Sequence, residues 1–165
     1  HILIKIFFKK LVLFKFLISF IIFILYISLY FTSMNIKPSQ QLVKEAQNSI
    51  ETLNSEDVKK LAENNEITLI DVRDIRELWK EGTIENSKHI PRGMLEFWLD
   101  PESTYYKANK IQDIKKMVLF CALGWRSALA TKSLVDMGFQ NVAHVDGGFD
   151  ALKKSGLKVI TKEKK

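Results

Sequence analysis

A single cysteine is the residue of this chain best suited to act as a nucleophile. Cys121 follows the apolar run 116–120, KMVLF, which is typical of a strand covered on both faces, and a helical pattern begins a few residues later. The thiol is therefore expected in a tight strand-to-helix loop. In sheets of parallel strands, ligands bind beyond the carboxyl ends of the strands, so this loop is well placed for chemistry.

The residues around Cys121 favour the thiolate over the thiol. Gly124 can adopt backbone angles that other residues avoid, which allows successive N–H groups to turn inward around an anion. The positive end of the following helix and the guanidinium of Arg126 act in the same direction. We predict Cys121 as a catalytic sulfur nucleophile, and the alternative is a buried structural cysteine. The expected substrate-binding residues are Ala122, Leu123, Gly124, Trp125 and Arg126.

Other polar residues near the expected loop are predicted to support it. Arg126 itself is expected to hold the oxyanion part of a ligand by two hydrogen bonds. Trp125 is interpreted either as an apolar wall for an acceptor or as packing. Arginines near other strand ends either add positive charge around the entrance to the site or are ordinary surface residues. The supporting set is Asp71, Arg73, Arg76, Arg92 and Ser127.

Composition argues against several other kinds of site. One cysteine forms no intramolecular disulfide, and the three histidines, His1, His89 and His144, lie at no familiar metal-ligand spacing from it, so neither a metal nor a cofactor is expected. The net charge of +6 divides into +4 from residues 1–33, which hold four lysines and no acid, and +2 from residues 34–165, which hold 21 basic and 19 acidic side chains. This near balance gives no indication of a nucleic-acid partner.

Strand and helix patterns alternate through the second part of the chain. Apolar, β-rich runs predict strands at 66–72, 88–90, 116–120 and 141–145. Helical spacing with capping residues predicts helices at 40–50, 53–65, 73–82, 126–137 and 148–156, and 100–110 is expected to be a loop. This alternation predicts an α/β fold of three layers, with a mainly parallel central sheet and helices on both faces.

The first 33 residues form a hydrophobic segment of different composition. Residues 11–31 are interrupted by one charge, Lys15, and roughly 20 apolar residues span a bilayer as a helix. The lysines cluster before this run, so a single-pass anchor with the domain outside the cytoplasm is expected, and no small-residue cleavage site follows it. The alternative is translation from Met34, which gives a cytoplasmic protein. The expected divisions are 1–33, a lead-in helix at 34–49, and one domain at 50–165.

Four motifs in order give the second part a specific resemblance. They are LIDVRDIREL at 69–78, EGTIENSKHIP at 81–91, VLFCALGWRSA at 118–128 and HVDGGFDAL at 144–152. Together they resemble the rhodanese-like domain family in its single-domain form, over about residues 50–160. The resemblance implies a sulfurtransferase in which Cys121 takes a sulfane sulfur from thiosulfate or a similar donor as a persulfide. It passes that sulfur to a thiol or cyanide-like acceptor, and Asp71 braces the loop.

Some positions depart from the family pattern, and two other functions compete. Thr83 stands where a histidine is common, Glu85 and Asn86 replace a usual Pro-Gly pair, and Leu152 stands where tryptophan is frequent.

One competing function is a non-catalytic rhodanese-like binding module. The other is a cysteine-dependent phosphatase or arsenate reductase with a Cys-x5-Arg loop. Here four residues separate Cys121 from Arg126, and that shorter loop suits a single sulfur better than a tetrahedral phosphate.

Overall fold

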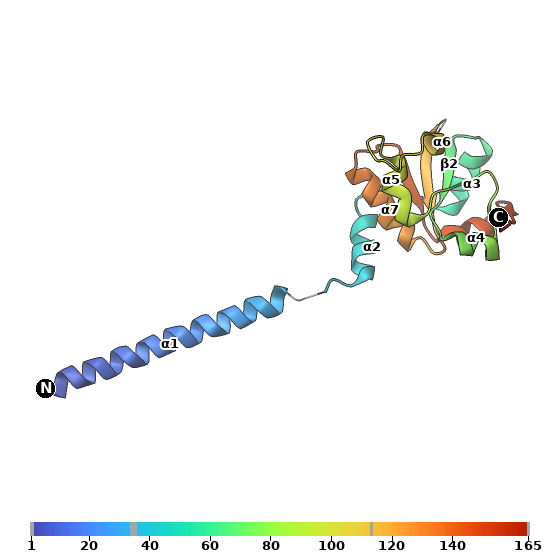
Figure 1. Ribbon diagram of the computed structural model, residues 1–165. Coiled ribbons are helices and arrows are strands. Elements are labelled where there is room, and N and C mark those ends of the chain that lie inside the picture. Colours follow the sequence, from blue (N-terminus) through green and yellow to red (C-terminus); the bar gives the residue numbers. More distant parts are fainter. Residues whose placement is uncertain (1, 34–35, 113, 165) are drawn as a thin grey trace. The chain divides into compact units, whose positions relative to one another are not determined.

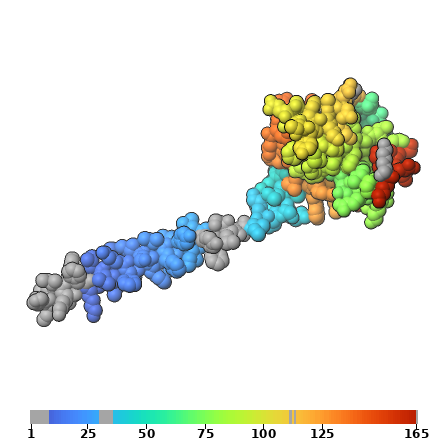
Figure 2. Space-filling view, in the orientation of Figure 1, coloured from blue at the N-terminus to red at the C-terminus, as the bar shows by residue number. Residues whose placement is uncertain are grey.

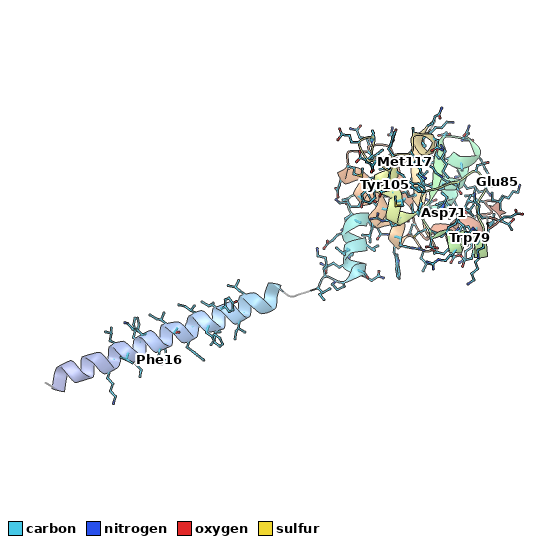
Figure 3. All side chains as sticks on the ribbon, in the orientation of Figure 1. Phe16, Asp71, Trp79, Glu85, Tyr105 and Met117 are labelled. Atoms are coloured by element: carbon cyan, nitrogen blue, oxygen red, sulfur yellow. The ribbon has the colours of Figure 1, made fainter. Side chains whose placement is uncertain are left out.

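The computed structural model describes residues 2–33, 36–112 and 114–164 and divides into two compact units, His1–Pro38 and Ser39–Lys165 (Figure 1). Helix α1, Ile2–Ser33, makes up the first unit. Its stretch Lys9–Leu29 has a mean hydropathy of 2.6 and is long and apolar enough to cross a membrane. Large apolar side chains such as Phe16 project from it into solvent (Figure 3). The alternative start, Met34, lies outside the described residues.

Five parallel strands form the central sheet of the second unit. Their order is β1-β6-β5-β2-β4, with β1 at Glu51–Leu53, β2 at Ile67–Asp71, β4 at Lys88–His89, β5 at Lys116–Phe120 and β6 at Val142–Val145. All the pairings are parallel, so the carboxyl ends of the strands meet at one edge. Asp71 pairs with Phe120 at that edge, which places the end of β2 directly beside Cys121.

Helices cover both faces of this sheet. One face carries α2 (Ser39–Gln47), the 3₁₀ turn η1 (Arg92–Met94), α5 (Leu95–Leu99) and α7 (Trp125–Asp136), and the other carries α3 (Ser55–Glu63) and α8 (Gly148–Lys154). The remaining helices are α4 (Ile75–Glu81) and α6 (Ala108–Ile111). In the space-filling view, the segment around α5 and α6, drawn in yellow, forms much of the near surface (Figure 2). The predicted α/β architecture with a parallel sheet is confirmed.

Alternation along β5 separates two apolar cores. Met117, Leu119 and Cys121 belong to the core under α5 and α7, and Val118 and Phe120 belong to the core under α3 and α8. Successive side chains of a strand point to opposite faces, and both faces here are buried, so the strand is apolar throughout. The thiol is therefore part of the core that lies below α7.

Several short elements differ from the sequence-based expectations. Strand β1 lies within a segment expected to lead from one helix to the next, and β3 (Thr83–Ile84) pairs antiparallel with β7 (Val159–Ile160) in a second small sheet. The short strands β1, β3 and β7 carry too little periodicity of their own to be recognised, and their position comes from tertiary pairing. Helix α6 likewise begins inside the expected loop 100–110.

Helix α2 belongs to the compact second unit. It buries Val43 and Ala46 and packs against α7. The unit accordingly begins at Ser39, before the domain start at residue 50 that the sequence suggests.

Candidate functional site

Cys121 lies in a tight turn between β5 and α7. Its Sγ accepts a hydrogen bond from the N–H of Gly124 at 3.2 Å, and the residue is 2% exposed. Gly124 has φ +94°, in the left-handed region that favours glycine, and this conformation turns the N–H back toward the sulfur. The turn therefore supplies one backbone donor to the thiol and directs the first turn of α7 toward it, where the helix dipole stabilises negative charge.

Ser127 closes the inner side of this turn. Its Oγ lies 3.7 Å from the Cys121 sulfur and 3.0 Å from the carbonyl oxygen of Gly124, and it is fully buried. One hydroxyl hydrogen serves one of these acceptors at a time. The shorter contact holds the turn, and the longer one can form when charge develops on sulfur.

A small pocket of about 100 Å³ opens above the sulfur. It is lined by Cys121, Ala122, Leu123, Trp125 and Arg126. Leu123 and Trp125 are 52% and 51% exposed, so they form an apolar rim rather than part of the core. Most of the wall of this pocket is apolar.

Arg126 points its guanidinium at a carboxylate. Nη1 and Nη2 donate to the two oxygens of Glu77 at 2.6 and 2.8 Å. This pairing raises the pKa of Arg126, an effect to which the nearby Cys121 sulfur adds, and it lowers the pKa of Glu77. Arg126 is thus held at the pocket, but its charge is already paired.

Two glycines after β6 support the turn from below. Gly148 has φ +57°, and a Cβ placed on it would lie 2.3 Å from the carbonyl oxygen of Cys121. The N–H groups of Phe149 and Asp150 donate to the carbonyl oxygens of Cys121 and Ala122 at 2.7 and 3.4 Å. The start of α8 therefore binds the outer carbonyls of the turn. The Gly-Gly pair in HVDGGFDAL was the sequence signal for this contact, although the expected site residues did not include it.

The Asp71 carboxylate contacts a different set of residues. It accepts hydrogen bonds from Nε and Nη2 of Arg73 at 3.0 and 2.8 Å and from Oγ1 of Thr83 at 2.7 Å. Asp71 and Arg73 are both fully buried, and Asp71 lies inside the second unit (Figure 3). The expectation that Asp71 braces the Cys121 loop is therefore corrected: it braces Arg73 and the start of β3. Thr83, noted as a departure from the family pattern, supplies the third contact.

Comparison with known proteins identifies the family. A family model for the rhodanese-like domain matches residues 54–155. This chain belongs to the rhodanese-like domain family. The family prediction made from the four motifs is confirmed. Rhodanese-like domain-containing protein 17 of Arabidopsis thaliana is 34% identical over 59% of this chain and 67% of its own length. For four curated relatives, the match covers between 27% and 89% of their own lengths.

Two solved structures resemble this rhodanese-like domain over most of its length. A Rhodopseudomonas palustris protein of unknown function, described as a possible tyrosine phosphatase, is 41% identical with a TM-score of 0.71 and covers 77% of this chain and 97% of its own. The polysulfide-sulfur transferase homodimer of Wolinella succinogenes is 36% identical with a TM-score of 0.56 and covers 75% of this chain and 88% of its own. The relatives of this domain therefore include a sulfur transferase.

The remaining arginines of this rhodanese-like domain do not add the positive charge around the entrance to the site that the sequence suggested. Arg73 is buried against Asp71, Arg76 pairs with Asp74 at 2.7 Å in solvent, and Arg92 pairs with Glu96 at 2.6 Å. Each charge is met by a carboxylate of its own segment. Arg126, expected as a substrate-binding residue, is the cation that lines the Cys121 pocket among the described residues. Arg73 is instead a buried structural residue, and Arg76 and Arg92 fit the alternative of ordinary paired arginines.

The histidines also serve structural contacts. His89 Nε2 lies 2.9 Å from the carbonyl oxygen of Arg73, and His144 Nε2 lies 3.1 Å from Oγ1 of Thr52. Within the part of the chain that the structure describes, no group of three His, Cys, Asp or Glu residues could hold a metal ion. The chemistry of the site thus rests on one sulfur, one amide, one hydroxyl and one paired guanidinium.

Proposed function

We propose that this protein is a sulfurtransferase that carries sulfane sulfur as a Cys121 persulfide from thiosulfate or a similar donor to a thiol or cyanide-like acceptor. The observation that carries the proposal is the 3.2 Å hydrogen bond from the Gly124 N–H to the Cys121 sulfur at the start of α7. A thiolate held by an amide at a helix start is the nucleophile that this chemistry needs. The sulfur transferase among its relatives supports the same reaction class.

The reaction has two balanced steps. In the first, the Cys121 thiolate attacks the outer sulfur of thiosulfate, the donor S–S bond breaks, and sulfite leaves with the bonding electron pair. The product is the Cys121 persulfide anion. In the second, an acceptor thiolate or cyanide attacks the outer persulfide sulfur and regenerates the Cys121 thiolate. The pocket of about 100 Å³ suits the added sulfur, and Ser127 and the Gly124 amide offer donors to the charge.

Mass spectrometry tests this proposal directly. Treatment of the purified chain with thiosulfate is expected to add about 32 Da to Cys121, and cyanide is expected to remove it as thiocyanate. Cys121→Ala is expected to gain nothing, because it is the only cysteine. Transfer that survives in Cys121→Ala, or an unchanged mass of the folded wild-type protein with both thiosulfate and cysteine persulfide as donors, would reject the proposal and leave the binding-module alternative.

A phosphatase is the competing enzyme, since one relative is described as a possible tyrosine phosphatase. Three observations count against it here: the four-residue spacing from Cys121 to Arg126, the small apolar pocket, and the occupation of Arg126 by Glu77. A dianionic phosphate needs free donors around it. Hydrolysis of p-nitrophenyl phosphate that disappears in Cys121→Ala would favour the phosphatase instead.

We further propose that α1 anchors the protein in a membrane through residues 11–31. The helix carries apolar side chains on all sides, as expected of a membrane-spanning segment; three of its four lysines precede residue 11, and the fourth, Lys15, lies near the start of the stretch. The domain then lies outside the cytoplasm. Carbonate-resistant sedimentation and digestion of the domain by external protease are the expected results. A soluble product that begins at Met34 would reject the anchor.

A further inference from the structure

The ion pair between Glu77 and Arg126 lies at the pocket of Cys121 and has no role in the two steps of the proposed reaction. We infer that Glu77 is a specificity-determining residue: it neutralises Arg126, so that the site disfavours dianionic sulfur donors such as thiosulfate and favours low-charge donors, organic persulfides. This inference rests on the proposed function, because it concerns which donor loads the same sulfur.

The pocket offers little other positive charge to a donor. Among the described residues that line it, Arg126 is the one cation, and Ala122, Leu123 and Trp125 are apolar. Both terminal nitrogens of Arg126 are engaged by the two oxygens of Glu77. The side chains of Arg126 and Glu77 are 42% and 29% exposed, so the pair borders the open mouth rather than the core. A donor that approaches Cys121 therefore meets an apolar wall and a cancelled charge.

Glu77 is also held in place from its own helix. It occupies the third position of α4, where its Oε2 accepts the N–H of Asp74 at 3.1 Å in a capping box. The same oxygen accepts Nη1 of Arg126 at 2.6 Å. The first turns of α4 and α7 are thus joined by this carboxylate, and releasing Arg126 requires breaking a two-pronged contact. The Glu77 carboxylate is therefore oriented by its own helix as well as by Arg126.

The charge that accumulates in the reaction differs between donors. Attack of the Cys121 thiolate on thiosulfate brings three negative charges together, one on the thiolate and two on the donor, and leaves a persulfide anion and sulfite. Attack on the outer sulfur of a protonated organic persulfide brings one negative charge and forms a protonated Cys121 persulfide. The donor S–S bond breaks, and the organic thiolate leaves with its electron pair. A neutral ion pair gives little electrostatic stabilisation to the negative charge that accumulates in the reaction with thiosulfate. It does not destabilise the reaction with the organic persulfide.

If Glu77 positions Arg126 instead of neutralising it, removal of the Glu77 carboxylate is predicted to have the opposite effect on the use of thiosulfate. If the carboxylate served to aim Arg126 at the sulfonate of thiosulfate, its loss would weaken the use of thiosulfate. If it cancels the charge, its loss frees a cation and strengthens that use. The sign of one measurement separates these roles.

The experiment compares Glu77→Gln with the wild-type protein. Glutamine keeps the length of the side chain and the oxygen that caps α4 but removes the charge. The readout is the rate of sulfur loading on Cys121 by mass spectrometry, with thiosulfate and with cysteine persulfide as separate donors. The thiosulfate rate constant is expected to rise about 3- to 5-fold, the persulfide rate constant to stay nearly constant, and the ratio of the two to shift accordingly. Glu96→Gln is the matched control, because Glu96 on α5 pairs with Arg92 on η1 and does not line the pocket.

A second variant guards against local disruption. Arg126→Gln leaves the Glu77 charge uncompensated at the pocket, so it is expected to move the donor ratio the other way, with a larger loss for thiosulfate than for cysteine persulfide. An unchanged ratio in both variants, or a thiosulfate rate that falls in Glu77→Gln, would overturn the inference. If neither thiosulfate nor cysteine persulfide loaded sulfur on Cys121 of the wild-type protein, the proposed function itself would be overturned. The failure of the inference and the failure of the proposed function are therefore distinguishable.

Discussion

Two arginines lie at the carboxyl ends of neighbouring strands in different surroundings. Arg73 follows β2, is fully buried, and binds Asp71, Glu81 and the carbonyl oxygen of Gly82. Arg126 follows β5, keeps 42% of its side chain exposed, and binds Glu77 beside the Cys121 pocket. Both are paired with carboxylates, so pairing alone does not distinguish the two arginines. They differ in burial and in whether they lie beside the Cys121 pocket.

The difference arises from the segments that cover each strand end. The end of β2 is covered by β3, which supplies Thr83, and by α8, whose Phe149 ring lies 3.9 Å from the Arg73 guanidinium carbon. The end of β5 turns at once into α7 through the left-handed Gly124 and leaves a small pocket open. The Arg73 cluster therefore stabilises the fold, and the Arg126 pair borders the Cys121 pocket. Substitutions that separate stability from activity test this distinction.

The largest effect is expected at the buried arginine. Arg73→Met leaves the Asp71 carboxylate buried without its cation and should cost about 3–5 kcal/mol of unfolding free energy. Sulfur loading per folded molecule should hardly change, because Arg73 does not line the Cys121 pocket. Chemical denaturation and loading assays on the same preparation measure both. Arg76→Met is the matched control, since Arg76 pairs with Asp74 in solvent, and it should leave the denaturation midpoint in place.

A glycine substitution tests whether the Cys121 turn depends on α8. Gly148→Ala places a methyl group against the carbonyl oxygen of Cys121 and should cost about 2–4 kcal/mol of unfolding free energy from overpacking and backbone strain. It should also slow sulfur loading, because the turn must move. Gly138→Ala isolates the strain: Gly138 has φ +98° but nothing within 4 Å of an added Cβ. Equal effects from both variants would show that the packing under the turn does not matter.

The elements with clear periodicity could be predicted from the sequence. Strands β2, β5 and β6 and helices α3, α4, α7 and α8 match the expected ranges to within two residues, and the side chain of Asn54 caps α3. The position of Cys121 in a strand-to-helix turn followed from the apolar run before it and the helical pattern after it. Local patterns were therefore enough to predict the parallel sheet and the location of the loop.

Contacts between distant segments could not be predicted in this way. Glu77 and Arg126 are 49 residues apart, and Thr83 and Asp71 are 12 apart, so no local period brings them together. A sequence shows that Arg73, Arg76 and Arg92 carry charge near strand ends. It does not show which carboxylate each one meets, because that depends on how α4 and β3 pack over the sheet edge.

A smaller effect on the reaction is expected at the exposed arginine. Arg126→Ala removes the cation and leaves Glu77 facing the pocket, which should reduce kcat/KM for thiosulfate by a factor that corresponds to about 1.5–3 kcal/mol. Thermal stability should change less than in Arg73→Met. Arg76→Ala should leave kcat/KM unaltered, because Arg76 binds Asp74 and does not line the pocket. Equal losses of kcat/KM in Arg126→Ala and Arg76→Ala would show that Arg126 has no special effect on the reaction at Cys121.

The smallest effect concerns His144, a buried titratable group on β6 that takes no part in either arginine cluster. It is fully buried, its Nε2 contacts Thr52, and its Nδ1 has no hydrogen-bond partner among the described residues. Burial lowers the pKa of His144 below its ordinary value, against a weaker opposing effect of Asp146. The unfolded chain therefore binds the proton at a higher pH than the folded one does.

Stability should accordingly fall as the pH drops through about 6.5, by at most about 1.4 kcal/mol per pH unit from this group. Above that range the imidazole is neutral in both states and contributes no pH dependence. Glutamine at this position keeps a polar side chain but does not titrate, so His144→Gln should have a shallower decline in unfolding free energy between pH 7.5 and 5.5 than the wild-type protein. The carboxylates contribute equally to both proteins, and the difference between the two slopes isolates the histidine. Identical slopes would mean that His144 is protonated as readily in the folded protein as in the unfolded chain, so burial on β6 would not disfavour a charge that, unlike those at the end of β2, has no buried partner of opposite sign.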